Sequence, residues 1–159
     1  MRIGQGFDVH KFCAGNYVTL GGIEIPFEFG LEAHSDGDVL LHAICDALLG
    51  AASLGDIGRH FPESSEEFRG ISSRELLVRV GRLIQERGFS AHNVDATILG
   101  ERPKIGPYSS EMQANIADDL RISPRQVNIK ATTTEKLGFT GRGEGLAAMA
   151  VCTIIDRDV

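Results

Sequence analysis

The segment from residue 146 to residue 155 is almost entirely apolar and lies near the end of the chain. It is far shorter than the ~20 residues that a membrane-spanning helix needs. A run of this kind is typical of a strand that is buried in the centre of a sheet or covered by another subunit. Any fold for this chain must therefore keep one long apolar strand out of contact with water.

Shorter segments supply the neighbours that such a strand needs. Apolar and polar side chains alternate with a period of two, as in half-buried strands, in residues 2–9, 94–99 and 127–132. Residues 17–20 and 23–25 flank Gly21 and Gly22, and two glycines between apolar runs favour a hairpin turn. The pattern predicts about four main strands and one small β-hairpin.

Helical spacing of apolar residues occurs in residues 38–53, 72–87 and 108–120. In the second of these segments, Ser72 and Glu75 are spaced as a capping box, and Gly88 is placed to end the helix. We therefore predict an α+β fold, in which a mixed sheet carries helices on one face. The opposite face of the sheet then needs cover, which assembly with other copies would supply.

Composition fits an ordinary globular protein and excludes several functions. The 159 residues, 42% of them apolar and 24% charged, predict a single domain over residues 1–159. A net charge of −6 argues against a nucleic-acid partner, because nucleic acid selects a basic surface. No signal peptide or membrane span is evident, and the three cysteines, which contain no CxxC pair, fit a reducing compartment. We expect a cytoplasmic protein with no membrane partner.

Asp8 and His10 are two residues apart on a predicted strand, so both side chains lie on one face. His42 lies on the helix that is predicted to follow. Two imidazoles and a carboxylate are a common zinc ligand set, whose open fourth position lets the metal act as a Lewis acid. Histidines with a purely structural role show the same spacing, so the pattern leaves both interpretations open. Asp38 and Asp46, one turn to either side of His42, fit either acceptors for its ring N–H or a solvated helix face.

A hydroxyl-rich segment follows the strand predicted over residues 127–132. Residues 132–134 are all threonine and Glu135 comes next, which suits phosphate oxygens and a bridging divalent cation but equally a threonine-rich strand end. Four glycines between residues 138 and 145 then predict a loop around Arg142, which fits an anion anchor or an exposed loop charge. This loop is not a dinucleotide-binding turn, because an apolar strand follows it rather than a helix.

These segments together resemble one protein family, in order and over nearly the whole chain. The segments are Gly6-Phe7-Asp8-Val9-His10, His34-Ser35-Asp36-Gly37-Asp38-Val39, His42, Gly55-Asp56-Ile57-Gly58, Phe61-Pro62 and the run from Lys130 to Arg142. They look like the signatures of the 2-C-methyl-D-erythritol 2,4-cyclodiphosphate synthases, which are lyases of the non-mevalonate pathway to isoprenoid and terpenoid precursors. The run from Lys130 to Arg142 is the most specific of them.

The resemblance implies a reaction. The substrate would be 4-diphosphocytidyl-2-C-methyl-D-erythritol 2-phosphate, whose own 2-phosphate attacks the β-phosphorus, releases CMP and closes a cyclic diphosphate. The family's zinc ligands match Asp8, His10 and His42, and Glu135 matches the residue that holds Mg²⁺ or Mn²⁺ together with the substrate phosphates. No protein nucleophile is required, so catalysis would consist of positioning and electrostatics.

The resemblance also implies which residues contact the substrate. His34 and Thr133 match the positions that stabilise the transition state. Contacts to the methylerythritol unit match Asp56, Ile57, Gly58, Phe61, Pro62, Glu63, Ser64 and Ser65. The cytidine pocket matches Gly100, Glu101, Arg102, Pro103, Lys104, Ile105 and Gly106. Further substrate-binding positions match Ser35, Thr132, Thr134, Phe139 and Arg142.

Members of this family are homotrimers around a threefold axis. The resemblance therefore implies active sites between subunits, with metal residues from one chain and a cytidine pocket from its neighbour. Phe7, Phe139 and Arg142 match a central cavity that binds isoprenoid diphosphates. The chain departs from the family at Glu63, where Asp usually follows Phe-Pro, and at Met149, where some relatives carry Glu near this cavity.

Two other functions share part of this pattern. A metal-dependent phosphodiesterase would use the same three metal ligands, with His34 as its general base, and would release a linear product. A trimeric binding protein for isoprenoid diphosphates would need Arg142 and the central cavity, but neither Glu135 nor the cytidine loop. The nature of the product separates these functions.

Overall fold

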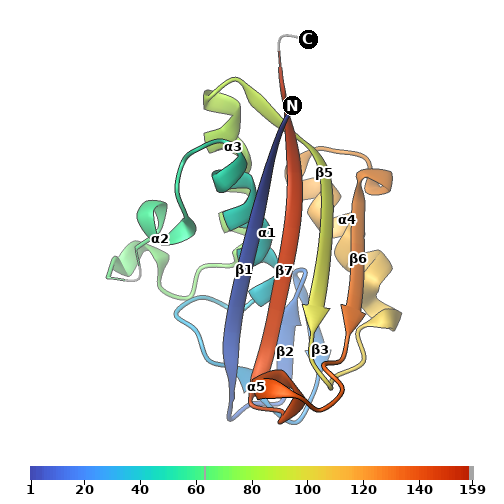
Figure 1. Ribbon diagram of the computed structural model, residues 1–159. Helices are drawn as coiled ribbons and strands as arrows, with labels where there is room; N and C mark the ends of the chain where they lie inside the picture. The colour runs from blue at the N-terminus through green and yellow to red at the C-terminus, as the bar shows by residue number, and fades with distance from the viewer. Residues whose placement is uncertain (63, 158–159) are drawn as a thin grey trace.

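The framework of the molecule is a five-stranded mixed sheet with the strand order β4-β1-β7-β5-β6 (Figure 1). A computed structural model describes residues 1–62 and 64–157. Its strands are β1 (Arg2–Cys13), β2 (Tyr17–Leu20), β3 (Ile23–Pro26), β4 (Gly30–Leu31), β5 (Phe89–Leu99), β6 (Val127–Thr132) and β7 (Gly145–Asp156). The strands β5 and β6 are parallel, whereas β7 runs antiparallel to β1 and β5, and β2 and β3 form a separate hairpin. The predicted α+β class, the four main strands and the hairpin are confirmed.

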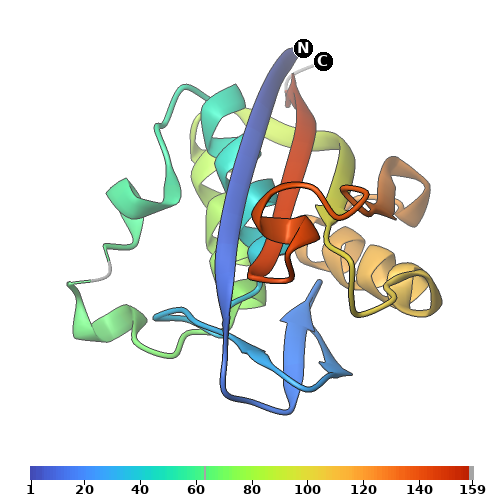
Figure 2. The same cartoon turned by 60° about the horizontal axis from the view of Figure 1, so that its bottom comes forward.

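Helices cover one face of the sheet and leave the other bare. The helices are α1 (Val39–Ala51), α2 (Ile57–His60), α3 (Ser73–Glu86), α4 (Ser109–Leu120) and α5 (Gly138–Gly141), and the 3₁₀ turns are Glu66–Phe68, Gly106–Tyr108 and Pro124–Gln126. Figures 1 and 2 show α1 behind β1 and β7, with α3 and α4 completing the layer. One hydrophobic core lies between this layer and the sheet. No helix in the described part of the chain is long and apolar enough to cross a bilayer.

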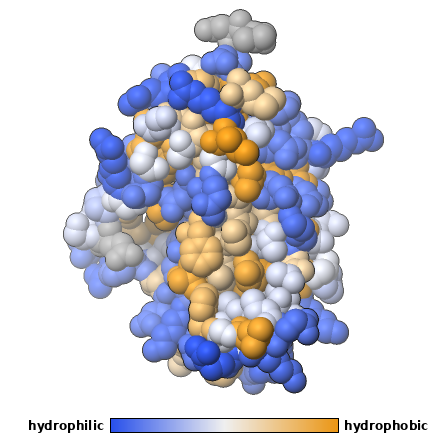
Figure 3. Space-filling view, in the orientation of Figure 1, coloured by the Kyte–Doolittle hydropathy of each residue, from blue (hydrophilic) through white to orange (hydrophobic). Residues whose placement is uncertain are grey.

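The central strand β7 is buried on one face only. Side chains on its inner face, such as Ala150 and Cys152, are buried, whereas Met149 and Val151 are 44% and 41% exposed. The exposed apolar side chains of the neighbouring β1 are Ile3, Phe7 and Val9. Figure 3 shows this face, with apolar side chains gathered along its centre. We call these five residues of β1 and β7 the apolar stripe, and it is the uncovered sheet face that the sequence predicts.

The helix α1 packs on β1 at unusually short range. A Cβ atom added at Gly6 would lie 1.9 Å from the backbone oxygen of Ala43, and one at Gly4 would lie 1.9 Å from that of Ala47. Only glycine allows this approach of backbone to backbone. The close packing brings the start of α1 next to the residues that follow Gly6 on β1.

Several local predictions differ from the structure. The strand β1 continues to Cys13 and β5 begins at Phe89, because pairing with β4 and β7 extends both beyond their alternating segments. Residues 138–141, predicted as part of a glycine-rich loop, form the helical turn α5. The capping box at Ser72 is wrong, since the Ser72 side chain makes no cap hydrogen bond and Asp36 Oδ2 accepts instead from the Ser73 backbone N–H at 2.9 Å.

Candidate active site

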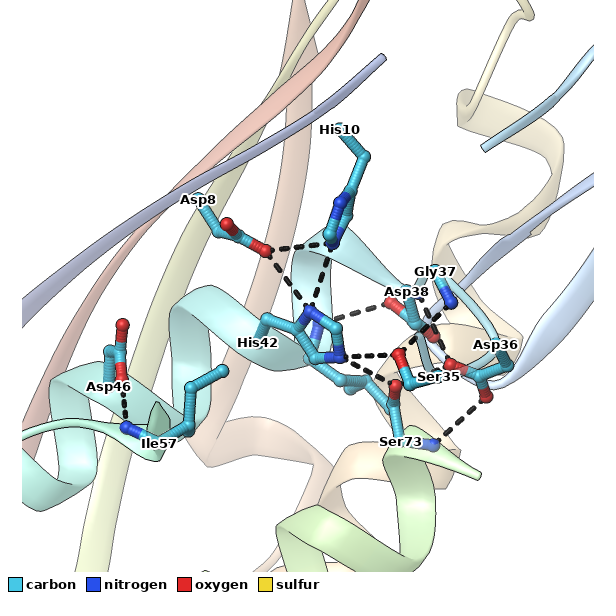
Figure 4. A network of polar contacts seen from close by, with 11 residues as sticks. Asp8, His10, Ser35, Asp36, Gly37, Asp38, His42, Asp46, Ile57 and Ser73 are labelled. Carbon is cyan, nitrogen blue, oxygen red and sulfur yellow. Dashed lines mark hydrogen bonds and ion pairs between the residues drawn. The ribbon is translucent and has the colours of Figure 1, made fainter. Parts of the chain in front are cut away.

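Asp8, His10 and His42 meet between β1 and the start of α1 (Figure 4). His42 Nδ1 lies 3.0 Å from His10 Nε2 and 3.1 Å from Asp8 Oδ2, and the His10 and Asp8 atoms are also 3.1 Å apart. The side chains of Asp8, His10 and His42 are 26%, 16% and 7% exposed. We call this cluster the metal triangle. The predicted contact between the Asp-x-His pair and the helical histidine is confirmed.

The size and chemistry of the metal triangle fit a divalent cation. One ligand atom from each residue lies within 4.8 Å of the other two, and the described residues form no other such group. Tetrahedral coordination at ~2.0 Å separates neighbouring ligand atoms by about 3.3 Å. The three atoms therefore need to move apart by only a few tenths of an ångström to coordinate a zinc-sized ion.

Electrostatics within the metal triangle favour an ionised carboxylate. Burial by itself raises the pKa of Asp8, but hydrogen bonds and charge interactions with the two histidines bring that pKa well below its usual range. Burial lowers the pKa of His42, whereas contact with Asp8 raises it above its ordinary value. An ionised carboxylate is the form in which Asp8 ligates a cation.

The other ring nitrogen of His42, Nε2, faces two serines. Ser73 Oγ lies 2.9 Å from it and Ser35 Oγ lies 3.2 Å from it. Ser73 is fully buried at the first position of α3, and its hydroxyl donates a short hydrogen bond to Asp36 Oδ1. Sequence reasoning missed Ser73, because nothing local marks a serine 31 residues from its histidine.

The two aspartates that flank His42 bind backbone groups and not its ring. Asp38 caps α1 and accepts hydrogen bonds from two backbone N–H groups, of Leu41 at 3.0 Å and Gly22 at 2.8 Å. Burial raises the pKa of Asp38 to about 6 in spite of these donors. Asp46 accepts from the backbone N–H of residue 57 at 2.8 Å and so fastens the start of α2. Neither aspartate accepts from the ring N–H of His42, and Asp38 is fully buried instead of solvated.

The metal triangle opens into a pocket bounded by α2. The predicted site residues that line this pocket are His34, Ser35, Ile57, Gly58 and Phe61. Asp56 caps α2 by accepting from the Arg59 backbone N–H at 3.0 Å. Pro62, Ser64 and Ser65 belong to the loop beyond α2 and do not line the pocket, and Glu63 lies outside the described residues. The metal triangle and part of the expected methylerythritol contacts therefore share one hollow.

The segment after β6 is exposed and held by its own side chains. Thr133 Oγ1 donates to Glu135 Oε1 at 3.0 Å. Glu135 and Lys136 have φ angles of 53° and 63°, which residues with a side chain seldom adopt. Glu101 Oε1 accepts from the backbone N–H groups of Thr134 and Lys136, each at 3.2 Å. Glu101 therefore braces the backbone on both sides of Glu135.

The threonines of this segment differ in where their hydroxyls point. Thr134 Oγ1 donates to the Leu137 carbonyl at 2.7 Å and contacts Thr140 Oγ1 at 2.9 Å, so it is used within the protein. Thr132 and Thr133 are exposed. Their hydroxyls donate locally, that of Thr132 to the Thr133 carbonyl at 3.1 Å and that of Thr133 to Glu135, but they lie at the surface, where a phosphate can reach them.

A second pocket lies beside this segment. The predicted residues that line it are Gly100, Glu101, Pro103, Lys104, Ile105, Gly106, Thr132 and Thr133. Arg102 does not line it, because its guanidinium pairs with Glu28 and lies 5.6 Å from the centre of the Phe27 ring. His10 pairs with Leu146 of β7, and Leu99 pairs with the adjacent Ala147 on the other side. The two pockets therefore lie at the same end of the sheet, on opposite sides of β7.

Comparisons with known proteins agree with one another. A family model described as the YgbB family matches residues 1–155. The chain belongs to the YgbB family. A relative from Azotobacter vinelandii, a 2-C-methyl-D-erythritol 2,4-cyclodiphosphate synthase, is 60% identical over 155 residues, which are 98% of this chain and 99% of the relative.

Solved structures of similar proteins share the fold. The bifunctional IspDF from Campylobacter jejuni matches with a TM-score of 0.94 and 42% identity, over 99% of this chain and 43% of that longer chain. IspF from Plasmodium falciparum, in a complex with CDP, matches with a TM-score of 0.85 and 33% identity, over 98% of this chain and 96% of that chain. This chain thus spans less than half of the bifunctional protein but nearly all of the other two relatives.

Of the residues that the family resemblance assigns to a central cavity, Phe139 and Arg142 lie just before the start of β7, and Phe7 pairs with Met149 on β7. Phe139 belongs to α5 and is 39% exposed, and Phe7 belongs to the apolar stripe and is 50% exposed. Arg142 directly follows α5 and pairs with Glu144 at 2.7 Å. These groups lie on surface that a single chain leaves open.

Proposed function

We propose that this chain converts 4-diphosphocytidyl-2-C-methyl-D-erythritol 2-phosphate into 2-C-methyl-D-erythritol 2,4-cyclodiphosphate and CMP, in the non-mevalonate pathway, with the help of bound metal ions. Membership of the YgbB family and 60% identity to a named synthase support the reaction. The observation that supports metal-assisted chemistry is the metal triangle, which places three cation ligands in the lining of a pocket.

The reaction needs no covalent help from the protein. An oxygen of the 2-phosphate bonds to the β-phosphorus, the bond from that phosphorus to the bridging oxygen breaks, and the electron pair leaves with CMP. Both reacting groups belong to one molecule, so holding them in line accounts for much of the rate enhancement over the uncatalysed reaction. Of the buried thiols, Cys152 has a pKa raised by burial to about 12, which leaves it protonated and unreactive.

Different residues of the chain would hold the metal ions that offset the repulsion between the 2-phosphate and the diphosphate. Asp8, His10 and His42 would hold Zn²⁺, which when bound would supply Lewis-acid stabilisation of the charge on the β-phosphate. Glu135, exposed next to Thr133, would share Mg²⁺ or Mn²⁺ with the substrate phosphates.

Further side chains would contact the phosphates and the nucleotide. We infer that His34, at the pocket that the metal triangle shares, steadies the β-phosphate. The Thr133 hydroxyl would donate to the α-phosphate. The second pocket, formed by residues 100–106, would hold cytidine, and the CDP complex of the Plasmodium falciparum relative supports such a nucleotide.

We further propose that the active form is a homotrimer. The apolar stripe supports assembly, since large exposed apolar patches on a monomer mark contact surfaces. The separation of the metal triangle from the second pocket by β7 supports a site that a neighbouring copy completes. Phe7, Phe139 and Arg142 would then line a central cavity suited to an isoprenoid diphosphate.

We also propose that the chain forms a single domain and acts in the cytoplasm. The single hydrophobic core supports one domain over residues 1–159. The free cysteines and the highly charged substrate support action in the cytoplasm.

The deciding experiment follows the products by ³¹P NMR. The purified protein with Zn²⁺, Mg²⁺ and the cytidyl diphosphate substrate is expected to yield a cyclic diphosphate and an equal amount of CMP. His42→Ala is expected to abolish both products, while His92→Ala, outside both pockets, serves as the matched control. A linear phosphate product would favour the phosphodiesterase. No turnover by a metal-loaded trimer would favour the binding protein.

A further inference from the structure

We propose that Ser73 is a positioning residue that, held by Asp36, sets the tautomer of His42 so that Nδ1 presents its lone pair to the metal. The proposal rests on the function proposed above, because it concerns the same metal triangle. The three groups come from distant parts of the chain, namely the loop before α1, α1 itself and the first residue of α3 (Figure 4).

The contacts are buried and close. Ser73 has no exposed surface, and its hydroxyl lies 2.9 Å from His42 Nε2. The same hydroxyl makes a short hydrogen bond to Asp36 Oδ1. Asp36 is itself held by the backbone N–H groups of Ser73, at 2.9 Å, and Asp38, at 3.2 Å. The carboxylate therefore has little freedom to turn away.

The direction of these hydrogen bonds follows from the chemistry of the groups. A carboxylate can only accept, so Ser73 must donate its single hydroxyl proton to Asp36. Ser73 is then left with lone pairs toward His42, and only a protonated Nε2 can bond to them. A neutral imidazole has one N–H, so Nδ1 is the bare nitrogen. Nδ1 lies 3.0 Å from His10 Nε2 and 3.1 Å from Asp8 Oδ2 in the metal triangle. A proton on His10 Nε2 can be donated to both acceptors, so the Asp8 carboxylate does not require a proton on His42 Nδ1.

Ser35, the other serine at Nε2, cannot set the tautomer in this way. Its Oγ lies farther away, at 3.2 Å, and accepts from the Gly37 backbone N–H at 3.2 Å. No acidic group takes the proton of Ser35 in the described contacts, so its hydroxyl can either donate to Nε2 or accept from it. Only the Ser73 hydroxyl is committed, because Asp36 holds its proton.

The test compares Ser73→Ala with Ser72→Ala, in which the same change is made at the adjacent residue, whose side chain makes no cap hydrogen bond. Long-range ¹H–¹⁵N spectra of the metal-free protein, above the titration range of the imidazoles, report the tautomer of His42. We expect Nε2–H in the parent and in Ser72→Ala, and a mixture of tautomers in Ser73→Ala. Titration with Co²⁺, read from its visible absorption, is expected to show binding weakened by about 10- to 100-fold in Ser73→Ala alone.

An unchanged tautomer and unchanged Co²⁺ affinity in Ser73→Ala would overturn the proposal. If that variant does not fold, Asp36→Asn decides with the same two readouts, because an amide can return a donor to Ser73 and free its hydroxyl proton for Nε2. The outcome is separate from that of the proposed function. A parent that binds Co²⁺ normally without forming a cyclic product refutes the reaction and leaves the role of Ser73 standing.

Discussion

The two halves of the candidate site are held by different means. The metal triangle lies on the strand β1 and the helix α1, which close packing at Gly4 and Gly6 brings together, and its side chains are 7–26% exposed. The Thr132–Lys136 segment lies at the surface and is held mainly by Glu101 and by its own side chains. The first half is shaped by the core, so it should be set before any ligand arrives. The second half can adjust to phosphates, a cation or a neighbouring copy.

This difference predicts that changes under the metal triangle alter stability and metal binding together, whereas changes in or beside the exposed segment alter turnover or its Mg²⁺ requirement without a loss of stability. A change to a buried, close-packed group also disturbs the packing of the core, so it lowers the stability of the fold. Exposed loops are the parts of a protein that open and move at the least cost in free energy.

Gly6→Ala is expected to have the largest effect. The added Cβ would lie 1.9 Å from the Ala43 backbone oxygen, so α1 must move away from β1. We expect the free energy of unfolding to fall by about 3 kcal/mol and metal binding to fall with it. Urea unfolding and Co²⁺ titration measure the two effects.

The control for this change is Gly50→Ala, in the same helix, where an added Cβ has no neighbour within 4 Å. It is expected to raise stability by up to about 1 kcal/mol, since alanine favours a helix. Equal stability of the two variants would contradict the view that close packing positions His42.

Glu135→Gln tests the exposed half. The amide keeps the shape of the side chain but loses the charge that would hold the second cation. We expect kcat to fall roughly 100-fold, or about 2.7 kcal/mol in the barrier, with no change in unfolding. Turnover over a range of Mg²⁺ concentrations measures this, with Glu86→Gln on the exposed end of α3 as the control. A fall in the free energy of unfolding of Glu135→Gln as large as its effect on the barrier would contradict the distinction between the two halves.

Asp38→Ala removes the cap of α1 and leaves two backbone N–H groups without their acceptor. We expect a loss of about 2 kcal/mol in stability. Chemical unfolding at neutral pH measures it, and a loss below a few tenths of a kcal/mol would show that α1 does not depend on this cap.

Asp38→Asn separates the charge of this cap from its hydrogen bonds. The pKa of Asp38 is raised from 3.8 to about 6, so the folded state holds the proton more tightly than the unfolded chain. The stability that the folded state gains by binding this proton is therefore full below pH 3.8 and is lost as the pH rises through 6. We expect the variant to lack this part of the pH dependence, and an identical pH profile would show that Asp38 does not titrate there.

Glu101→Ala should have the smallest effect. It removes the acceptor for two backbone N–H groups beside Glu135, both at 3.2 Å, in a segment that water can reach. We expect the Mg²⁺ concentration for half-maximal turnover to rise about threefold. This matches the net free energy of ~0.5–1.5 kcal/mol that an intramolecular hydrogen bond typically contributes. Glu101→Gln keeps an acceptor oxygen and should behave like the parent. Equal effects of the two variants would assign the loss to the charge of Glu101 instead of its hydrogen bonds.

Local patterns in the sequence determined much of this protein. The period-two alternation along β1 put Asp8 and His10 on one face, and the apolar run before Asp156 predicted the central strand. The helical pattern over residues 38–53 supplied His42 as a candidate third ligand, the family resemblance favoured that role, and the structure brings His42 to 3.0 Å from His10. The outer ends of β1 and β5 could not be predicted, because pairing with other strands, and not alternation, extends them.

What only the tertiary structure decided depends on contacts between distant residues. Ser73 meets His42 across 31 residues and Asp36 across 37, while the local capping box at Ser72 does not form. Asp38 and Asp46, placed by helical spacing beside His42, bind backbone groups instead, because those donors come from turns that spacing cannot place. Spacing along a strand or helix follows from the geometry of the backbone and can be read from the chain itself. The partner of a buried polar group depends on which segments the packed core brings within hydrogen-bonding distance, and only the folded chain determines that.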